Sequence, residues 1–395
     1  MPRSFLILSV LIAAWAGGNV AVTAAHPQAA PGVTSLTNPA VKFTVPAAHH
    51  VQLKRGPVTV IITDNAAVDV PELPAHRAGL NGVASLKHAS TGVNFFVPPF
   101  SGLNLEVIHD GTGKVNKDIF DPRSSPMQLR VVDEYTVELH QPPTALWQLE
   151  SCGRFHLLPD GVIEYTFECI PRAATFAPAW FSLFWASYIE QPENNGIRFR
   201  GLETGGTAPP TAAPGDKGWI YALSPDHGVD SSIPPAGPLP QVTFTPDFPL
   251  HLVTSRSRYV HTEPWYYGTS HGLAYVQMFR QRDGIWFSQS PSGGGSINPA
   301  WDFYWFVRDW KVNEAYGLVM RAACLPLKTR HKSRRQRVSI APRSALPEKR
   351  RKQRRAVANP LGRTCFQCPC LPLASVQASY KKEKRERRES GGRPF

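Results

Sequence analysis

The sequence lacks any run of about 18 apolar residues beyond its N-terminal segment, so no later membrane span is expected. It also lacks a glycine-rich phosphate loop and the alternation of strand and helix that accompanies such loops. Thirty-eight prolines and thirty glycines leave little room for long helices. What remains is a chain built mainly from strands and turns.

Cysteine is also scarce, with six in 395 residues. Cys365, Cys368 and Cys370 form a C-x-x-C-x-C motif without a convincing fourth ligand, whereas strong zinc patterns have two ligand pairs. We therefore predict neither a metal site nor a cofactor. The other three cysteines lie in the strand-rich part, where export would allow two of them to be oxidised.

The first 25 residues are typical of a cleaved signal peptide. Arg3 supplies a positive charge, residues 5–13 are apolar but short for a membrane span, and small residues follow at 14–16 and 23–25. The mature protein is therefore expected to be exported to the periplasm or the extracellular space, with residues 26–49 as an N-terminal arm. An uncleaved N-terminal anchor is the alternative interpretation.

The net charge of +13 comes from the C-terminal tail, residues 328–395. The tail contains 21 Lys and Arg against four Glu, a charge of +17, which leaves 22 basic and 26 acidic residues elsewhere, a charge of −4. Blocks of like charge with little apolar content predict disorder. A nucleic-acid or anionic-membrane arm is one interpretation of this tail, but export argues against nucleic acid as a partner. A misread end of the gene is the other.

Residues 127–167 predict an antiparallel meander with one buried face. Large apolar side chains occupy odd positions in four successive runs, and each run ends at a turn. Together with further strand-like runs at 59–62, 94–97, 181–189, 219–223, 250–254, 271–279, 301–310 and 317–325, this predicts one all-β domain over residues 50–327. The expected fold class is a large antiparallel two-sheet sandwich with few short helices.

The turn at residues 159–161 decides whether Cys152 and Cys169 can be joined. A two-residue turn would set them opposite each other but would mix apolar and acidic side chains on one face. A three-residue loop pairs Phe155 with Tyr165, and His156 with Glu164, so every face agrees. Burying three large side chains outweighs one disulfide across a short loop. We therefore predict that the two cysteines are unbonded and point to opposite faces.

The order of this meander, with residues 136–139, Trp147 and residues 157–163 followed by an aromatic and His-bearing second half, resembles the galactose mutarotase-like β-sandwich superfamily. The resemblance covers roughly residues 50–327. It implies binding of a sugar on a concave sheet and, in the epimerases of the superfamily, ring opening by a His acid and a carboxylate base. The sequence contains no His-Pro-aromatic motif of the epimerase type, so catalysis does not follow from the fold.

The stretch 256–310 is the densest mixture of ionisable side chains and large rings, and it is the predicted site. In residues 271–279 the even positions are small or apolar and the polar groups lie at the odd positions His271, Tyr275 and Gln277, which predicts an even core face and an odd site face. Asp283-Gly284 is expected to form a hairpin turn that sets Phe279 opposite Phe287 and Gln277 opposite Gln289. The alternative is an ordinary half-exposed sheet with solvated polar side chains.

Acid-base chemistry needs a His and a carboxylate within reach of one bond. His261 and Glu263, two residues apart, are expected on one face of a strand, and Arg256 and Arg258 have the same spacing, suitable for gripping a uronate carboxylate. The candidate catalytic residues are His261, Glu263, His271 and Asp302; the candidate substrate-binding residues are Arg256, Arg258, Trp265, Tyr267, Tyr275, Gln277, Gln289 and Trp301.

Two classes of function fit these residues. The first is an exported carbohydrate-active enzyme, an epimerase or lyase that uses His and carboxylate acid-base chemistry. The second is a non-catalytic glycan-binding or cell-surface interaction protein, because aromatic rings stack on sugars whether or not a bond is broken. A His and a carboxylate that converge in one place would distinguish the enzyme from the binder.

Overall fold

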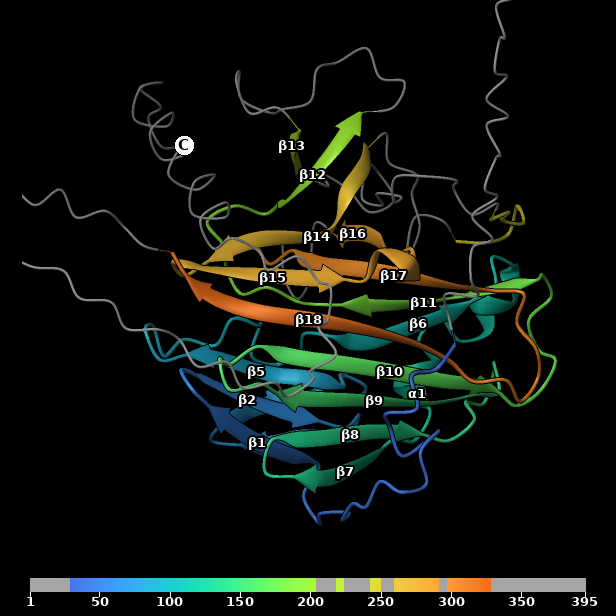
Figure 1. Cartoon of the computed structure of the whole chain (residues 1–395), viewed down its shortest axis with the longest axis horizontal. Helices are drawn as coiled ribbons and strands as arrows, with labels where there is room; N and C mark the ends of the chain where they lie inside the picture. The colour runs from blue at the N-terminus through green and yellow to red at the C-terminus, as the bar shows by residue number, and fades with distance from the viewer. Residues whose placement is uncertain (1–28, 204–217, 224–241, 250–258, 291–296, 328–395) are drawn as a thin grey trace, which may run out of the picture.

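The computed structural model describes residues 29–203, 218–223, 242–249, 259–290 and 297–327 (Figure 1). The predicted signal peptide and the basic tail lie outside these residues, and export remains a prediction. Among the described residues, no helix has the length and apolar character needed to cross a membrane. The elements are β1 His50–Arg55, β2 Val58–Thr63, β3 Val68–Val70, β4 Leu73–His76, β5 Gly82–His88, β6 Asn104–His109, η1 Gly113–Lys117, α1 Asp121–Ser124, β7 Gln128–Asp133, β8 Thr136–Gln141, β9 Leu149–Leu157, β10 Ile163–Pro171, β11 Trp180–Ala186, β12 Ile197–Glu203, β13 Trp219–Ala222, β14 Tyr259–Ser270, β15 Leu273–Phe279, η2 Gln281–Asp283, β16 Trp286–Ser290, β17 Ala300–Arg308 and β18 Tyr316–Pro326.

The fold is an antiparallel β-sandwich, as predicted. One layer is a nine-stranded sheet in the order β13-β12-β14-β15-β18-β10-β9-β8-β7. The other layer combines a four-stranded sheet, β16-β17-β11-β6, with a three-stranded sheet, β1-β2-β5, which a bridge between Val83 and Gly102 links to the chain just before β6. Figure 1 shows these two layers stacked, with β12 and β13 at one end.

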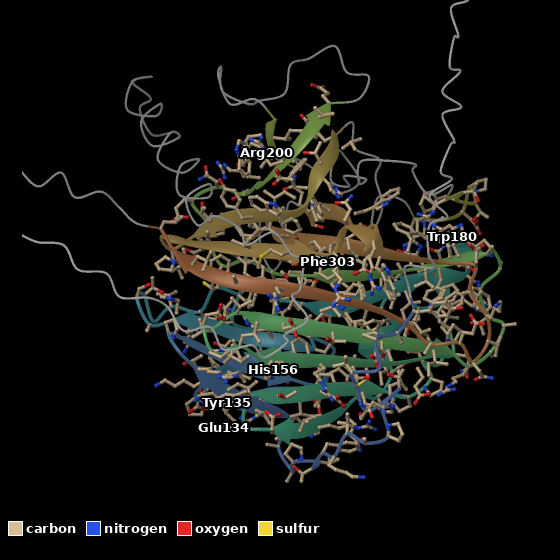
Figure 2. The ribbon with its side chains drawn as sticks, in the orientation of Figure 1. Glu134, Tyr135, His156, Trp180, Arg200 and Phe303 are labelled. Carbon is tan, nitrogen blue, oxygen red and sulfur yellow. The ribbon has the colours of Figure 1, made fainter. Side chains whose placement is uncertain are left out.

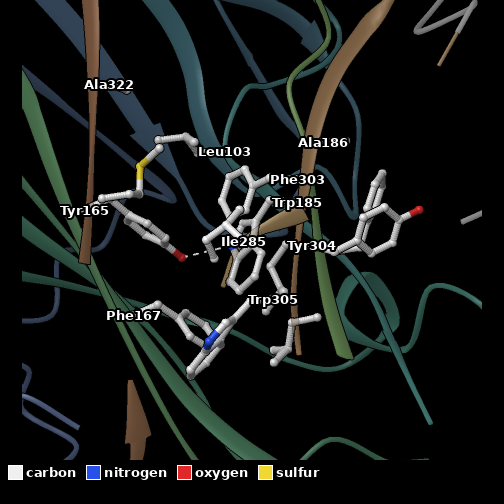
Figure 3. Packing of buried hydrophobic residues seen from close by; sticks show 14 of the residues in the cluster. Leu103, Tyr165, Phe167, Trp185, Ala186, Ile285, Phe303, Tyr304, Trp305 and Ala322 are labelled. Carbon is white, nitrogen blue, oxygen red and sulfur yellow. Dashed lines mark hydrogen bonds between the residues drawn. The ribbon is translucent and has the colours of Figure 1, made fainter. Parts of the chain in front are cut away.

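Aromatic side chains from both layers fill the interior of the sandwich (Figure 3). Phe167 of β10 meets Trp185 of β11 edge to face at 4.9 Å, and Trp185 stacks on Phe303 of β17 at 5.0 Å. Trp185 Nε1 donates a hydrogen bond to the Tyr165 hydroxyl at 3.1 Å, so the buried indole N–H is satisfied. Burial of each such ring contributes roughly 1.5–3 kcal/mol, and this stabilises the packing of the two layers.

The meander of β7, β8, β9 and β10 has the predicted register. Leu157 pairs with Ile163, Phe155 with Tyr165 and His156 with Glu164. Gly161 adopts the left-handed conformation, with φ of 83°, that the three-residue loop requires. Cys152 and Cys169 are both unbonded, as predicted. Cys169 lies in the interior, whereas the Cys152 thiol contacts Glu138 on the other face of the sheet.

The hairpin expected around Asp283-Gly284 is wrong. β15 pairs with β14 and β18 in the nine-stranded sheet, whereas β16 pairs with β17 in the four-stranded sheet. Gly284 is left-handed, with φ of 58°, but the segment carries the chain from one layer to the other. Phe279 and Phe287 still meet, with ring centroids 5.9 Å apart, because they face each other across the interior.

The predicted faces of β15 are reversed. Tyr275 packs on Phe95 in the interior, and Gln277 is buried there with its amide donating to the Trp301 carbonyl at 3.4 Å. Ala274 and Val276 lie on the opposite face of the strand. The polar odd residues therefore mark the core, because the Phe95 ring, from the segment between β5 and β6, and the Trp301 carbonyl of β17 contact them there.

Other strand predictions had mixed outcomes. β2, β11, β13, β17 and β18 lie where they were expected, and β17 is a central strand buried on both faces. The expected strand at 94–97 is absent; Asn94 and Phe96 form only isolated bridges. The expected strand at 250–254 lies outside the described residues.

A segment near the N-terminus crosses the nine-stranded sheet. Ala29 bridges to Tyr316 at the start of β18, and Thr44 bridges to Val131 of β7, at the edge of the sheet. We call residues 29–44 the N-terminal strap. In Figure 1 it is the blue trace that passes over β18, β10, β9 and β8.

Candidate functional site

The structure divides the predicted site residues among several surfaces. Arg256 and Arg258 lie outside the described residues. Tyr275, Gln277 and Trp301 are buried in the interior, as is Gln289, which pairs with Trp301 across β16 and β17. His271 lies at the turn between β14 and β15, with φ of 51°. The expectation that these residues line one site is therefore wrong, because they lie in separate places.

His261 and Glu263 point to opposite faces, so the prediction that they form a local pair is wrong. The His261 ring stacks on Phe287 in the interior, with centroids 3.9 Å apart. Glu263 instead accepts a hydrogen bond from Trp265 Nε1 at 2.8 Å. The cause is a break in the pairing of β12 and β14, where the register shifts opposite the residues that follow His261.

Asp302 belongs to a third location. Trp301 and Phe303 point into the interior, so Asp302 lies on the other face of β17. Its buried carboxyl accepts hydrogen bonds from the Ser187 N–H and the Ser290 hydroxyl, both at 3.2 Å. Burial, with a smaller effect of Glu106, raises the pKa of Asp302 well above its usual value. Asp302 is therefore not a partner of Glu263.

A different set of side chains forms a continuous row on the nine-stranded sheet. We call the face turned away from the other layer the outer face. Cross-strand pairing places one residue from each of six adjacent strands in a line, which we call the outer row: Trp265 of β14, Met278 of β15, Arg321 of β18, Glu164 of β10, His156 of β9 and Thr136 of β8. At about 4.8 Å per strand the row is roughly 24 Å long.

The polar end of the outer row holds a His, a carboxylate and a guanidinium side by side. Arg321 donates from Nε and Nη2 to Glu164 Oε2 at 3.0 and 2.7 Å. His156 is directly opposite Glu164 across β9 and β10, and its Nδ1 shares a hydrogen bond with the Thr136 hydroxyl at 2.7 Å. His156 and Arg200, at the two ends of this face, are labelled in Figure 2.

Two polar atoms at this end are open to a ligand. Both hydrogen bonds from Arg321 to Glu164 end on Oε2, so Arg321 leaves Oε1 of this carboxylate to other donors. The Nδ1 atom of His156 is held by Thr136, which directs Nε2 away from that contact. The Glu164 and Arg321 side chains retain 22% and 29% of their exposure, so the pair is accessible from solvent.

The aromatic end of the row is a cluster of rings with charged neighbours. Trp219 meets Trp265 edge to face at 5.5 Å, and Tyr267 lies within 5.8 Å of Trp219. The Arg200 guanidinium lies 5.4 Å from the Trp219 ring. Of the predicted site residues, the binding candidates Trp265 and Tyr267 and the catalytic candidate Glu263 are therefore on the outer face, and both rings are buried there.

Neighbouring groups on this face are less suited to chemistry. Burial, together with the charge of Glu138, raises the pKa of the Cys152 thiol, so it stays protonated and is a poor nucleophile. Burial also lowers the pKa of His140 despite its hydrogen bond to Glu150. Within the described part of the chain, no group of three or more His, Cys, Asp or Glu side chains is placed to hold a metal ion.

The outer row was only partly visible in the sequence. The register of the meander predicts that His156 faces Glu164, but it does not predict Arg321, which lies 157 residues from Glu164. The alignment of Trp265 and Met278 with this pair depends on β15 and β18 being neighbours. Sequence reasoning therefore found the pair but missed its role in a site.

No family model matches the chain, and no curated protein matches it. Solved structures resemble it weakly. One is a galactose mutarotase-related enzyme from Lactobacillus acidophilus, with 10% identity, a TM-score of 0.44, and coverage of 70% of this chain and 97% of that chain. Another is a protein assigned as an aldose 1-epimerase from Escherichia coli K12, with 11% identity, a TM-score of 0.42, and coverage of 72% and 100%.

A heparan sulfate lyase from Pedobacter heparinus is a further match, with 9% identity, a TM-score of 0.32, and coverage of 75% of this chain and 39% of that chain. These proteins are carbohydrate-active enzymes. Two of them are thus named for galactose mutarotase or aldose 1-epimerase, and the similarity to each is weak.

Proposed function

We propose that this protein binds a carbohydrate, an oligosaccharide rather than a single sugar, along the outer row. The observation that carries the proposal is the linear succession of Trp265, Met278, Arg321, Glu164 and His156 across five neighbouring strands. A row of roughly 24 Å is longer than one sugar ring, and each strand adds a new side chain at a regular spacing.

The chemistry of the row suits a ligand with many hydroxyls and apolar ring faces. At the aromatic end the half-buried Trp219 covers the buried rings of Trp265 and Tyr267, so Trp219 is the ring that offers an apolar surface to the C–H face of a sugar. Glu164 Oε1 accepts a hydrogen bond from a sugar hydroxyl, while Oε2 holds the guanidinium of Arg321 in place. A charge-assisted hydrogen bond of this kind contributes more than a neutral one.

Titration of the full chain with soluble oligosaccharides, followed by calorimetry, tests the proposal. Glu164→Gln should weaken binding about tenfold, because a hydrogen bond to a charged group contributes roughly 1.5–3 kcal/mol. Glu150→Gln is the matched control. Glu150 lies on β9 of the same meander and also accepts a hydrogen bond from an arginine, Arg172, at 2.6 Å, but it is outside the outer row. Equal losses in both variants, or no binding of any glycan by the unaltered protein, would contradict the proposal.

A second candidate is catalysis by the same residues. His156 and Glu164 are adjacent across two strands, the arrangement that acid-base chemistry at one bond requires. If the bound sugar reacts, His156→Gln should lower the rate about a hundredfold or more while leaving binding within a few fold. Polarimetry of fresh α-galactose, together with measurement of newly formed reducing ends, follows both expected reactions. Binding without any turnover would refute catalysis and support the non-catalytic binding function.

A further inference from the structure

The N-terminal strap occupies the part of the outer face next to the outer row. Its two ends are fixed by backbone hydrogen bonds: Ala30 N–H donates to the Ala315 carbonyl at 3.2 Å, and Thr44 N–H donates to the Val131 carbonyl at 2.8 Å. Between these anchors the strap is held mainly by polar contacts to side chains of the sheet. Its contacts therefore show what this part of the sheet binds.

Glu168 of β10 is the first of two carboxylates under the strap. It is buried and accepts hydrogen bonds from Val33 N–H at 2.8 Å, Thr34 N–H at 3.3 Å and the Thr34 hydroxyl at 2.6 Å. The Thr37 hydroxyl donates to it as well. Two hydroxyls and two amides thus converge on one carboxylate.

Glu138 of β8 is the second carboxylate, and its side chain is fully buried. It accepts hydrogen bonds from Ser35 N–H at 3.1 Å and from the Ser35 hydroxyl. Arg154 donates to Glu138 from Nε at 2.7 Å, and Arg130 donates to the Ser35 hydroxyl at 2.8 Å. Ser35 is therefore gripped by a carboxylate and a guanidinium together.

Three hydroxyls within four residues thus satisfy two carboxylates and an arginine. This donor set is the one that a polyol with adjacent hydroxyls presents, and carboxylates with arginines are suited to bind it. Pro31 also packs against Gly317, and the Phe43 ring lies under Arg130 at 4.4 Å. A ligand with comparable hydroxyls would replace the hydroxyl contacts of the strap.

We propose that Glu138, Arg130 and Glu168 form a second polyol-binding subsite, which the strap's Thr34, Ser35 and Thr37 occupy in the absence of ligand. The inference rests on the proposed carbohydrate function and extends it. Glu164 and Glu168 lie four residues apart on β10, roughly 13 Å, with Thr166 and Arg154 between the two subsites. A longer glycan bound along the outer row reaches the second subsite only when the strap leaves it.

Hydrogen exchange of the unaltered full chain tests this inference directly. The amides of Val33, Thr34 and Ser35 should lose protection when galactose or cellotetraose is added, because their acceptors are taken by the sugar. Amides of β9 and β10 should keep theirs. Betaine, an osmolyte without hydroxyls, controls for the general stabilisation that excluded solutes cause. Unchanged exchange of the three strap amides at sugar concentrations that bind would overturn the inference.

A variant gives the reciprocal measurement. Thr34→Val, Ser35→Ala and Thr37→Val together remove the three hydroxyls, and galactose binding should become roughly tenfold tighter because less of the strap must be displaced. Adding Glu168→Gln should cancel the gain. Thr245→Val is the matched control, because its hydroxyl also donates to a carboxylate, that of Asp247, far from the strap. An unchanged affinity in a folded triple variant would also overturn the inference.

The two proposals fail in different ways. If the outer row binds sugar but the strap amides do not respond, only the second subsite is refuted. If Glu164→Gln has no effect while the strap amides do respond to sugar, the outer row is refuted and the second subsite stands. If the triple variant does not fold, the exchange experiment on the unaltered chain still decides.

Discussion

The meander of β7 to β10 and the segment from β14 to β17 contrast in how they are assembled. In the meander, consecutive strands pair with each other and the odd residues of β9 and β10 face the interior. In the second segment, β14 and β15 belong to one layer and β16 and β17 to the other. Local turns therefore decide the register of the first region, whereas contacts between distant strands decide that of the second.

The two Asp-Gly turns show the same contrast. Asp160-Gly161 joins β9 to β10 and leaves its aspartate exposed, while Asp283-Gly284 carries the chain between layers and buries the aspartate. Both glycines adopt the left-handed conformation. An Asp-Gly pair thus indicates the local backbone conformation but not whether the flanking strands pair.

The largest expected effect compares two glycines that lie under aromatic rings, one in each region. A Cβ at Gly268 of β14 would lie 2.3 Å from the Trp301 ring, whose indole is held by the Asn195 carbonyl. A Cβ at Gly153 of β9 would lie 2.7 Å from the hydroxyl end of Tyr165. Gly268→Ala should cost about 3 kcal/mol and Gly153→Ala about 1–2 kcal/mol. Urea unfolding of both variants measures the difference. An equal loss of unfolding free energy would show that both regions accommodate an added methyl group equally well.

An intermediate effect is expected from the buried turn. Burial, opposed by Arg282 and Arg280, raises the pKa of Asp283 from 3.8 to about 6. The folded state therefore binds more protons than the unfolded state between these pH values, so this group's contribution to stability falls as the pH rises from 3.8 to about 6.

Asp283→Asn mimics the protonated form. It should stabilise the protein by about 1–2 kcal/mol at pH 7 and change little at pH 4, whereas Asp160→Asn at the exposed turn should have little effect at either pH. Thermal unfolding across this pH range checks both. A stabilisation by Asp283→Asn that does not depend on pH would contradict the titration argument.

The smallest effect concerns the ion pair of the outer row. Glu164 and Arg321 are partly exposed, so a double-mutant cycle with Glu164→Gln and Arg321→Met should give a coupling of about 0.5 kcal/mol. The more deeply buried Glu138–Arg154 pair should give a larger coupling, because its carboxylate is fully buried. Similar coupling energies would mean that the strap does not shield Glu138 from water.

The meander was predictable because apolar side chains alternate along strands whose partners are close in sequence. Its register, its turn and the separation of Cys152 from Cys169 all follow from that alternation. The faces of β15 were not predictable, because Tyr275 and Gln277 are polar in character and buried in fact. The ring beside Tyr275 is Phe95 and the acceptor for Gln277 is the Trp301 carbonyl of β17, and no local pattern in the sequence predicts either contact.

The candidate site was less predictable than the fold. Dense polar and aromatic composition pointed to residues 256–310, yet of the candidate site residues that the structure describes only Glu263, Trp265 and Tyr267 reach the outer face near the row. The register shift after His261 places its side chain on the opposite face from Glu263, and the spacing of residues in the sequence does not predict such a shift. Arg321 joins Glu164 only because β18 inserts between β15 and β10.

The strap also bears on the order in which the chain assembles. The contact between Thr34 and Glu168 closes a loop of 134 residues, and Ala29 must find Tyr316 across almost the whole domain. Contacts that distant form late, since the entropy of closing the loop is lost before they contribute any stability. The strap is the first of the described segments to be translated but is thus the last to dock. Its docking site does not exist until β8, β10 and β18 belong to one assembled sheet.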